Sequence, residues 1–358
     1  MILGRFIAGE LARGWLVMIV ILASLFGLLA LLDEADRISE RYTFLHVLQY
    51  VLYTTPQRVL ELSPVIAALG TVVAFAQMSR NSELVVIRAS GVSIRRLLGY
   101  CAIPTLLLVA LIAVASEFVV SNLHQHAETQ RAVLRSGNLN LLKQGGIWAS
   151  SNHRYFNVGH LRLGTLPEDI SVYEVDDAGA LVRVVEAQSA EPIGSREWRL
   201  IDVVIKQWAD NKVSTRHEDE LVIDEFWSEN ELPTLGNSYA SMSPSTLSDY
   251  ADYLESTGQP ARAVQLAFWQ RVTGPIFAAT MVLLCFVLGL SFGSTRSAQF
   301  GLRVFGTTVV SVGAYLLTQI FHTSGQLAGL SEMLIVLVPI GVVVVVSAAL
   351  LLPLTRHR

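Results

Sequence analysis

Residues 14–32 read GWLVMIVILASLFGLLALL and contain no charged side chain. A helix needs about 20 mostly apolar residues to cross the hydrocarbon core of a bilayer, which is roughly 30 Å thick. A helix also satisfies its own backbone hydrogen bonds, so it is the expected form of such a segment in lipid. Five further stretches lack charge when His322 is counted as neutral: 62–79, 97–116, 272–295, 304–331 and 333–355. The sequence therefore predicts six transmembrane helices.

A long polar insert divides these helices into two groups of three. The chain has 358 residues, of which 52% are hydrophobic and 16% are charged, whereas a soluble domain carries about 25% charged residues. Residues 117–271 hold most of the polar sequence and are too long for a loop. We expect three parts: helices 1–3 in 1–124, a soluble domain in 125–260, and helices 4–6 in 261–358.

The distribution of arginine predicts the orientation in the membrane. If the N-terminus is inside, the inner segments are 1–13, 80–96, 296–303 and 356–358, and their only acids are Glu10 and Glu83. These segments carry the following basic residues: Arg5, Arg13, Arg80, Arg88, Arg95, Arg96, Arg296, Arg303, Arg356 and Arg358. Because basic residues are enriched on the cytoplasmic side, we expect both termini in the cytoplasm and the insert outside.

The insert has the pattern of a β domain. Short β-prone segments at 170–175, 180–185, 198–208 and 221–226 are separated by turn residues. This spacing is typical of a sandwich, a jelly roll or a barrel-like sheet. Both cysteines, Cys101 and Cys285, lie outside the insert. The domain must therefore fold on its own hydrophobic core, without disulfides.

Residues 80–91 form the most distinctive inner segment. Leu84, Val85, Ile87 and Arg88 fall around one turn of a short amphipathic helix, and Gly91 is a suitable helix stop. Two interpretations remain open on the residues alone. A short helix here would dock into a groove on a cytosolic partner, or it would rest on the lipid surface as an interfacial helix.

Several short motifs resemble one known family. They are ELVVIRASG at 83–91, QGGIW at 144–148, LESTG at 254–258, FGSTR at 292–296 followed by GLR at 301–303, and YLLTQIF at 315–321. Together with the three-plus-three layout and the β-rich insert, they resemble the LptF/LptG permeases of the lipopolysaccharide export ABC transporter. The resemblance covers essentially the whole chain and is stronger to the LptG branch than to the LptF branch.

This resemblance implies a fold and a set of partners. The insert would be a periplasmic β-jelly roll that continues a lipid-carrying bridge. The chain would be a non-enzymatic permease subunit of the bacterial inner membrane, assembled with LptF, an LptB ATPase dimer and LptC. ATP and Mg would be used by the ATPase alone. Residues 80–91 match the family's coupling helix, with Glu83 as the expected ATPase contact and Leu84, Arg88 and Gly91 completing the segment.

The resemblance also implies a phosphate site at the outer surface. Arg37 and Arg131 fall where family members bind the phosphosugar region of lipopolysaccharide, and Arg41 and Arg135 are nearby. The arginine fork suits this role because it donates two parallel hydrogen bonds to phosphate. However, Asp36 and Glu128 stand where some relatives are basic. The alternative is an interfacial charge cluster that only fixes the ends of helices.

Charge-free spans leave apolar candidates for binding acyl chains. A proton- or sodium-driven transporter usually places ionisable residues near the membrane midplane, and these spans have none. The residues expected to line an acyl-chain cavity are Phe26, Leu29, Phe305, Tyr315 and Gln319. Plain helix packing or lipid contact is the alternative for each of them.

No chemistry of its own is expected from the chain. Its lysines are Lys143, Lys206 and Lys212, and none follows glycine, so a Walker A loop is absent. The two histidines of the sequence HQH at 124–126 are more often solvated than metal-bound, and the insert offers no cysteine to complete a site. We expect no metal, no cofactor and no nucleic acid. The rival to a lipid exporter is a mechanotransmission or sensor protein that moves no lipid.

Overall fold

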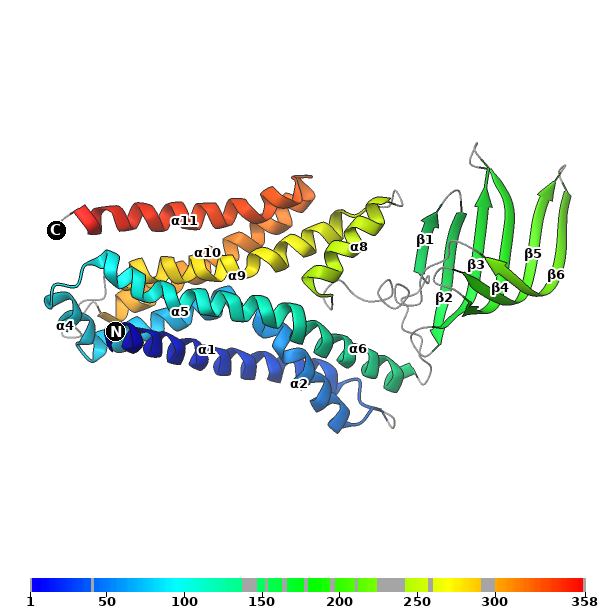
Figure 1. Cartoon of the computed structure of the whole chain (residues 1–358). Coiled ribbons are helices and arrows are strands. Elements are labelled where there is room, and N and C mark those ends of the chain that lie inside the picture. The colour runs from blue at the N-terminus through cyan, green and yellow to red at the C-terminus, as the bar shows by residue number, and fades with distance from the viewer. Residues whose placement is uncertain are drawn as a thin grey trace.

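In the computed structural model, a bundle of long helices makes up most of the molecule, and a β-sheet lies beyond one end of it (Figure 1). Both chain termini lie at the opposite end of the bundle. We call the end of the bundle next to the sheet the sheet end. The opposite end carries the short helix α4 (Glu83–Ala89) and is called the α4 end. The structure describes residues 2–39, 42–136, 147–151, 154–162, 166–176, 180–193, 197–209, 212–223, 242–256, 260–290 and 300–356.

Helices precede and follow the sheet. Those before it are α1 (Ile2–Ala35), α2 (Phe44–Glu61), α3 (Ser63–Arg80), α4 (Glu83–Ala89), α5 (Ile94–Val114), the π-helix η1 (Ala115–Val120) and α6 (Ser121–Ser136). Those after it are α8 (Pro244–Ser256), α9 (Arg262–Gly289), α10 (Phe300–Leu327) and α11 (Glu332–Arg356). The chain from α5 through α6 forms one long helical path from the α4 end to the sheet end (Figure 1).

The helices confirm a multi-span membrane protein. Within the described residues, five helices are long and apolar enough to cross a bilayer, or six spans if the bent pair α2–α3 counts as one. The two helices of this pair meet at 72°. The predicted second span, 62–79, thus coincides with α3, the second half of this bent pair, and α2 precedes it as a separate helix. Pro64 in the first turn of α3 fits this break, because an N–H group there needs no intrahelical partner.

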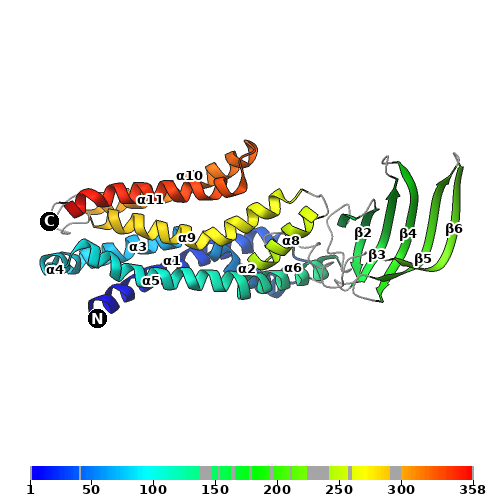
Figure 2. The same cartoon turned by 45° about the horizontal axis from the view of Figure 1, so that its top comes forward.

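The inserted domain is an antiparallel sheet. Its strands are β1 (Ile147–Ser151), β2 (Arg154–Arg162), β3 (Leu166–Val175), β4 (Leu181–Pro192), β5 (Trp198–Ala209) and β6 (Lys212–Ile223). The order in space follows the order in sequence, so each described strand pairs with its neighbour in the chain. Two views agree that the sheet is curved and lies beyond the bundle (Figures 1 and 2).

One face of the sheet carries its core. Because side chains alternate between the two faces of a strand, residues two apart lie on the same face of the sheet. Val158 lies opposite Ile170, and Val172 lies opposite Val185. Trp198 and Leu200 on β5 are fully buried in the same cluster. The predicted β domain between helical halves is therefore confirmed, and its described core contains no cysteine.

Helix α3 is the centre of the bundle, with most of its residues buried. On one side it meets α1, where a Cβ at Gly14 would collide with the carbonyl oxygen of Gly70. The Trp15 indole donates to the carbonyl of Ala67 and to the Thr71 hydroxyl, each at 3.2 Å. Small residues such as Gly14 and Gly70 let helix backbones approach closely in a membrane.

On its other side α3 packs against α9. A Cβ at Gly289 would lie 2.9 Å from the ring of Phe75, and that ring meets Phe286 edge to face at 5.6 Å. Helix α3 is therefore held between two helices by contacts that depend on glycine.

Gly14→Ala should lower the free energy of unfolding by about 1–3 kcal/mol, the usual cost of overpacking a tight contact. The added methyl group has no space because the Gly70 backbone occupies it. Unfolding in mixed detergent micelles would measure the change. Gly9→Ala is the matched control, because a Cβ at Gly9 meets nothing within 4 Å. Equal stability of both variants would show that the α1–α3 contact is looser than described.

Candidate functional sites at the two ends of the bundle

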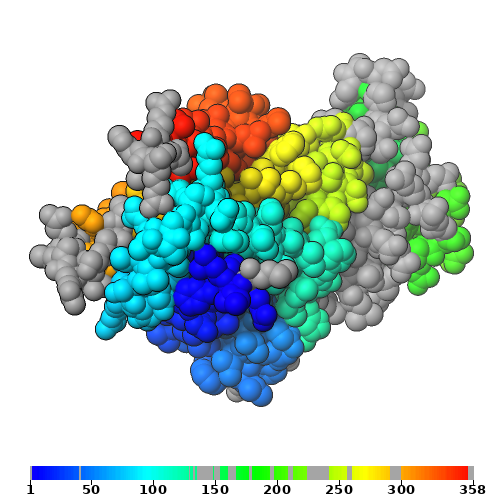
Figure 3. Space-filling view, turned by 60° about the vertical axis from the view of Figure 1, so that its left-hand side comes forward, coloured from blue at the N-terminus to red at the C-terminus, as the bar shows by residue number. Residues whose placement is uncertain are grey.

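Helix α4 lies at the end of the bundle remote from the sheet. In the space-filling view of this end, the cyan segment that includes α4 lies close to the blue N-terminus of α1 (Figure 3). Leu84 is 1% exposed and belongs to the core of the bundle. The helix follows Ser82, at φ 61°, and is followed by Gly91, at φ 83°. Gly91 therefore ends the helix as predicted, since glycine adopts this left-handed conformation without strain.

The other predicted coupling residues tie α4 to its surroundings. Arg88 donates from Nη1 to the carbonyl oxygen of Leu290, at the C-terminus of α9, over 3.1 Å. Cations at this position satisfy the last carbonyl groups of a helix. Glu83, Leu84 and Arg88 thus lie on α4, and Gly91 follows its C-terminal end. Arg88 links α4 to the C-terminus of α9 by one hydrogen bond.

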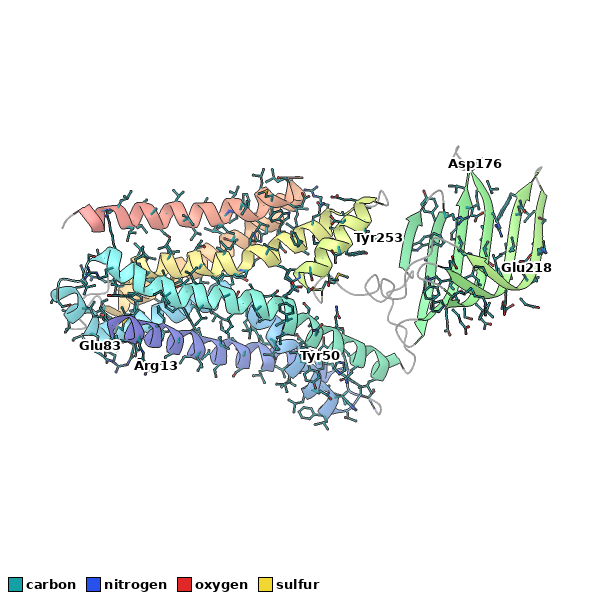
Figure 4. All side chains as sticks on the ribbon, in the orientation of Figure 1. Arg13, Tyr50, Glu83, Asp176, Glu218 and Tyr253 are labelled. Atoms are coloured by element: carbon teal, nitrogen blue, oxygen red, sulfur yellow. The ribbon has the colours of Figure 1, made fainter. Side chains whose placement is uncertain are left out.

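Glu83 is half-buried at the start of α4, far from the sheet (Figure 4). Its Oε1 accepts a hydrogen bond of 3.3 Å from Asn81, and its Oε2 is buried with no partner among the described residues. An unsatisfied buried acceptor costs free energy. The Glu83 Oε2 atom can therefore accept one further hydrogen bond.

Two exposed apolar residues of α4 were not among the predicted coupling residues. Val85 is 43% exposed and Val86 is 65% exposed, although both sit beside the buried Leu84 and Ile87. The signal was available, because four consecutive apolar residues at 84–87 make a helix apolar on all sides. A short helix with one apolar side buried and another exposed has a surface suited to a partner.

A second candidate site lies at the sheet end, around a buried carboxylate. Glu34, near the end of α1, is only 3% exposed. It accepts hydrogen bonds from Arg131 on α6 at 2.7 and 3.0 Å, and from Arg37 at 2.8 Å. The sequence predicted a role for both arginines but not for Glu34. The spacing of Glu34 and Arg37, three residues apart on a helix, was the available signal.

Helix α2 completes this cluster. The ring of Tyr50, labelled in Figure 4, lies 4.8 Å from the guanidinium carbon of Arg131. The Tyr50 hydroxyl donates to Glu128 at 2.7 Å. Arg131 therefore contacts α1 through Glu34, α2 through Tyr50, and Glu128 on its own helix at 3.5 Å.

The electrostatics of the cluster separate its two arginines. Two arginines face two carboxylates, Glu34 and Glu128, so the group is close to neutral. Burial lowers the pKa of Arg131, but the hydrogen bond to Glu34 and the nearby Tyr50 and carboxylates raise it more, and the net pKa lies above the usual value. The Arg131 side chain is 18% exposed and that of Arg37 is 44% exposed. Arg131 thus connects α6 to α1 and α2, whereas the Arg37 side chain remains accessible. Arg41 lies outside the described residues.

The five residues predicted to line an acyl-chain cavity fall into three places. Tyr315 and Gln319 line a cavity of about 470 Å³ inside the bundle. Phe305 lines a separate groove of about 640 Å³ between α1, α3 and α10. Phe26 is half-buried and Leu29 is 45% exposed, both on α1, and neither borders these two cavities.

The described residues contain no group of three His, Cys, Asp or Glu side chains that could hold a metal ion. In the HQH sequence, the Nε2 atom of His126 instead lies 2.9 Å from the side-chain nitrogen of Gln130.

Comparisons with known proteins cover both helical halves and the sheet. The family model described as lipopolysaccharide export system permease LptF/LptG matches residues 5–353. The lipopolysaccharide export system permease protein LptG of Haemophilus influenzae is 28% identical over 297 residues, which cover 80% of each chain. The protein of the same name from Escherichia coli K12 is 27% identical over 347 residues, which cover 94% of each chain.

Arg131→Ala should lower the free energy of unfolding by about 2–4 kcal/mol, because it leaves the buried Glu34 carboxylate without its bidentate partner. Arg37→Ala should cost only about 0–1 kcal/mol, as expected for an exposed ion pair. Detergent unfolding of both variants provides the comparison. A loss of equal size for the two would mean that Arg131 does not hold the three helices together.

Proposed function

The chain belongs to the LptF/LptG family of lipopolysaccharide export system permeases, and on that premise we propose that it is an LptG-type subunit that moves lipopolysaccharide out of the inner membrane. As a family member with five or six apolar spans, it is a multi-pass inner-membrane protein and a non-enzymatic transporter subunit. The lipid would pass to the β domain and onward along a bridge to the outer membrane.

The position of α4 is the observation that carries this proposal. The helix exposes Val85 and Val86 at the end farthest from the sheet, while Leu84 and Arg88 fix it to the bundle. That combination suits a coupling helix, which must bind a partner and transmit its movement. Exposed arginines at this end, Arg95 and Arg96 among them, support a cytoplasmic location for α4 and both termini. The sheet would then be periplasmic.

The partners follow from the single coupling helix. An LptB ATPase dimer presents two equivalent grooves, and this chain supplies one α4 among its described helices. A homodimer is the commoner way to supply two helices, but the family contains two permease types. We therefore assign the second groove to LptF, with LptC as a further subunit. ATP and Mg would bind to LptB, and this chain would need no cofactor of its own.

An energy source is needed because the substrate is strongly lipophilic. Each acyl CH₂ that leaves the bilayer gives up about 0.8 kcal/mol of hydrophobic free energy, so a multi-chain lipid cannot be extracted without an alternative apolar path and external work. The groove that contains Phe305, between α1, α3 and α10, has mostly apolar walls and would form part of such a path.

Phosphate recognition at the sheet end would rest on Arg37 more than on Arg131. Arg37 is 44% exposed, and its carboxylate partner is shared with Arg131. A lipid phosphate would therefore replace one hydrogen bond of Arg37 rather than break the buried pair. Arg41 would add to this site.

Val86→Ala should weaken ATPase binding about tenfold. The change removes about two methylene equivalents of contact, worth 0.8 kcal/mol each, and 1.4 kcal/mol is tenfold in affinity. Glu83→Ala should weaken binding as well, by removing the polar group at the start of α4. Copurification and titration of the ATPase measure both effects. Ile2→Ala is the control, because Ile2 is 87% exposed at the same end. Full ATPase binding by both α4 variants would rule out the coupling role.

Arg37→Ala should reduce lipopolysaccharide crosslinking to a photoreactive residue on neighbouring α1, while basal ATP hydrolysis by the purified assembly stays unchanged. The matched control is Arg13→Ala, since Arg13 is also paired with a glutamate three residues earlier on α1 but lies near the opposite end. Mass spectrometry of the assembly would identify subunits and lipid together. An assembly that binds an ATPase but never yields a lipid adduct would favour the rival mechanotransmission function.

A further inference from the structure

Helix α8 folds back on the start of α9 at the sheet end of the bundle (Figures 1 and 2). Leu247 and Leu254 of α8 are buried together with Val264 of α9, in a small hydrophobic cluster that is separate from the main core of the bundle. The Glu255 side chain at the end of α8 also accepts a hydrogen bond from Gln265. These contacts fix α8 to the N-terminal part of α9, at the end of the bundle that faces the sheet.

Tyr253 of α8 connects this cluster with the core of the sheet. Its side chain packs against both the α8–α9 cluster and the sheet cluster that contains Trp198 and Leu200. Its ring also stacks on that of Tyr250, with 6.4 Å between the ring centres and 13° between the ring planes. Figure 4 shows Tyr253 on the side of the bundle that faces the sheet. The core of the sheet therefore contacts the bundle through an aromatic side chain of α8.

Glu117 holds the other end of α8. It lies on the π-helix η1, directly after α5, and its carboxylate accepts hydrogen bonds from the backbone N–H of Ser245, at 3.3 Å, and from the Ser245 hydroxyl. Ser245 is in the first turn of α8, where backbone N–H groups have no partner within the helix and a negative charge is favoured. A carboxylate on one helix therefore caps a helix that is 128 residues away in the chain.

The π-helical turn that carries Glu117 interrupts the long path from α5 to α6. Within it, the Ser121 hydroxyl donates to the carbonyl oxygen of Ser116, five residues earlier, at 3.1 Å. π-Helical turns are rare and occur frequently at functional sites. This turn lies where the path leaves the charge-free stretch 97–116 and meets α8, which supports a functional role for the contact between Glu117 and Ser245.

We propose that Glu117 and Tyr253 are positioning residues for export, which together hold α8 so that the core face of the sheet keeps a fixed orientation to the bundle. The proposal rests on the passage of lipid from the bundle to the β domain, as argued under the proposed function. An acyl chain exposed to water between the two parts is strongly unfavourable, so the transfer requires that the two parts stay aligned. Glu117 and Tyr253 act through α8 and need not touch the lipid.

Spin labels on the purified assembly test this alignment without following the lipid. One label replaces Leu181 on β4, which is 41% exposed, and the other replaces Leu327 at the sheet end of α10, which is 87% exposed. Pulsed EPR should give a narrow distance distribution for the parent. Glu117→Ala should raise the share of other distances about tenfold, the weight of one hydrogen bond to a charged group.

Tyr253→Ala should broaden the distances in the same way, whereas Tyr253→Phe, which keeps the ring, should behave as the parent does. Distributions that stay narrow in both alanine variants would overturn the proposal.

Lipopolysaccharide crosslinking tests the consequence for export. With a photoreactive residue in place of Ile205, on the core face of the sheet, Glu117→Ala should reduce the lipid adduct about tenfold. Crosslinking on α1 and copurification of the ATPase should stay unchanged. Glu10→Ala is the matched control, because the Glu10 carboxylate also binds a side chain on the bundle surface but lies near the α4 end (Figure 4).

Exchange of the pair, Glu117→Ser together with Ser245→Glu, should restore both the narrow distances and the sheet adduct, which a general loss of stability would not allow. An equal loss of adduct on α1 and on the sheet would contradict the positioning role. A parent that forms no adduct at either place would contradict the proposed function instead, and the EPR distances would still decide the positioning role.

Discussion

The close approach of α1 and α9 to the central helix α3 is the constraint on which the rest of the bundle depends. Lipid is as apolar as leucine, so burial alone does not drive membrane helices together, and tight packing must do so. Gly14 meets Gly70 on one side of α3, and Gly289 meets Phe75 on the other. The Trp15 indole fixes the register by donating to α3.

This packing connects the two ends of the molecule. At the α4 end, Leu84 extends the bundle core into α4 and Arg88 binds the C-terminus of α9. At the sheet end, Arg131 joins α1, α2 and α6 through Glu34 and Tyr50. Work done on α4 can therefore reach the outer parts of the bundle through helices that are already in contact.

The polar groups near the sheet end divide into two systems with different roles. The arginine cluster is nearly neutral and mainly structural, with Arg37 as its accessible member. The cavity lined by η1, α9 and α10 among other helices instead holds Ser116 and His322, whose Oγ and Nε2 atoms are buried without a partner among the described residues. The first system gains stability from its ion pairs, and the second leaves two buried polar atoms unsatisfied.

The sequence by itself determined the spans, the inserted β domain and the α4 segment, because transfer free energy, β periodicity and the stop at Gly91 are local properties. The sequence predicted part of β3, β4 and β5. It predicted β6 only from residue 221, because residues 214–220 are polar and form a strand only through pairing with β5. Only the tertiary structure placed Glu34 against Arg131, buried Leu84, and separated Phe305 from Tyr315. These outcomes depend on which distant residues meet, and no local pattern encodes that.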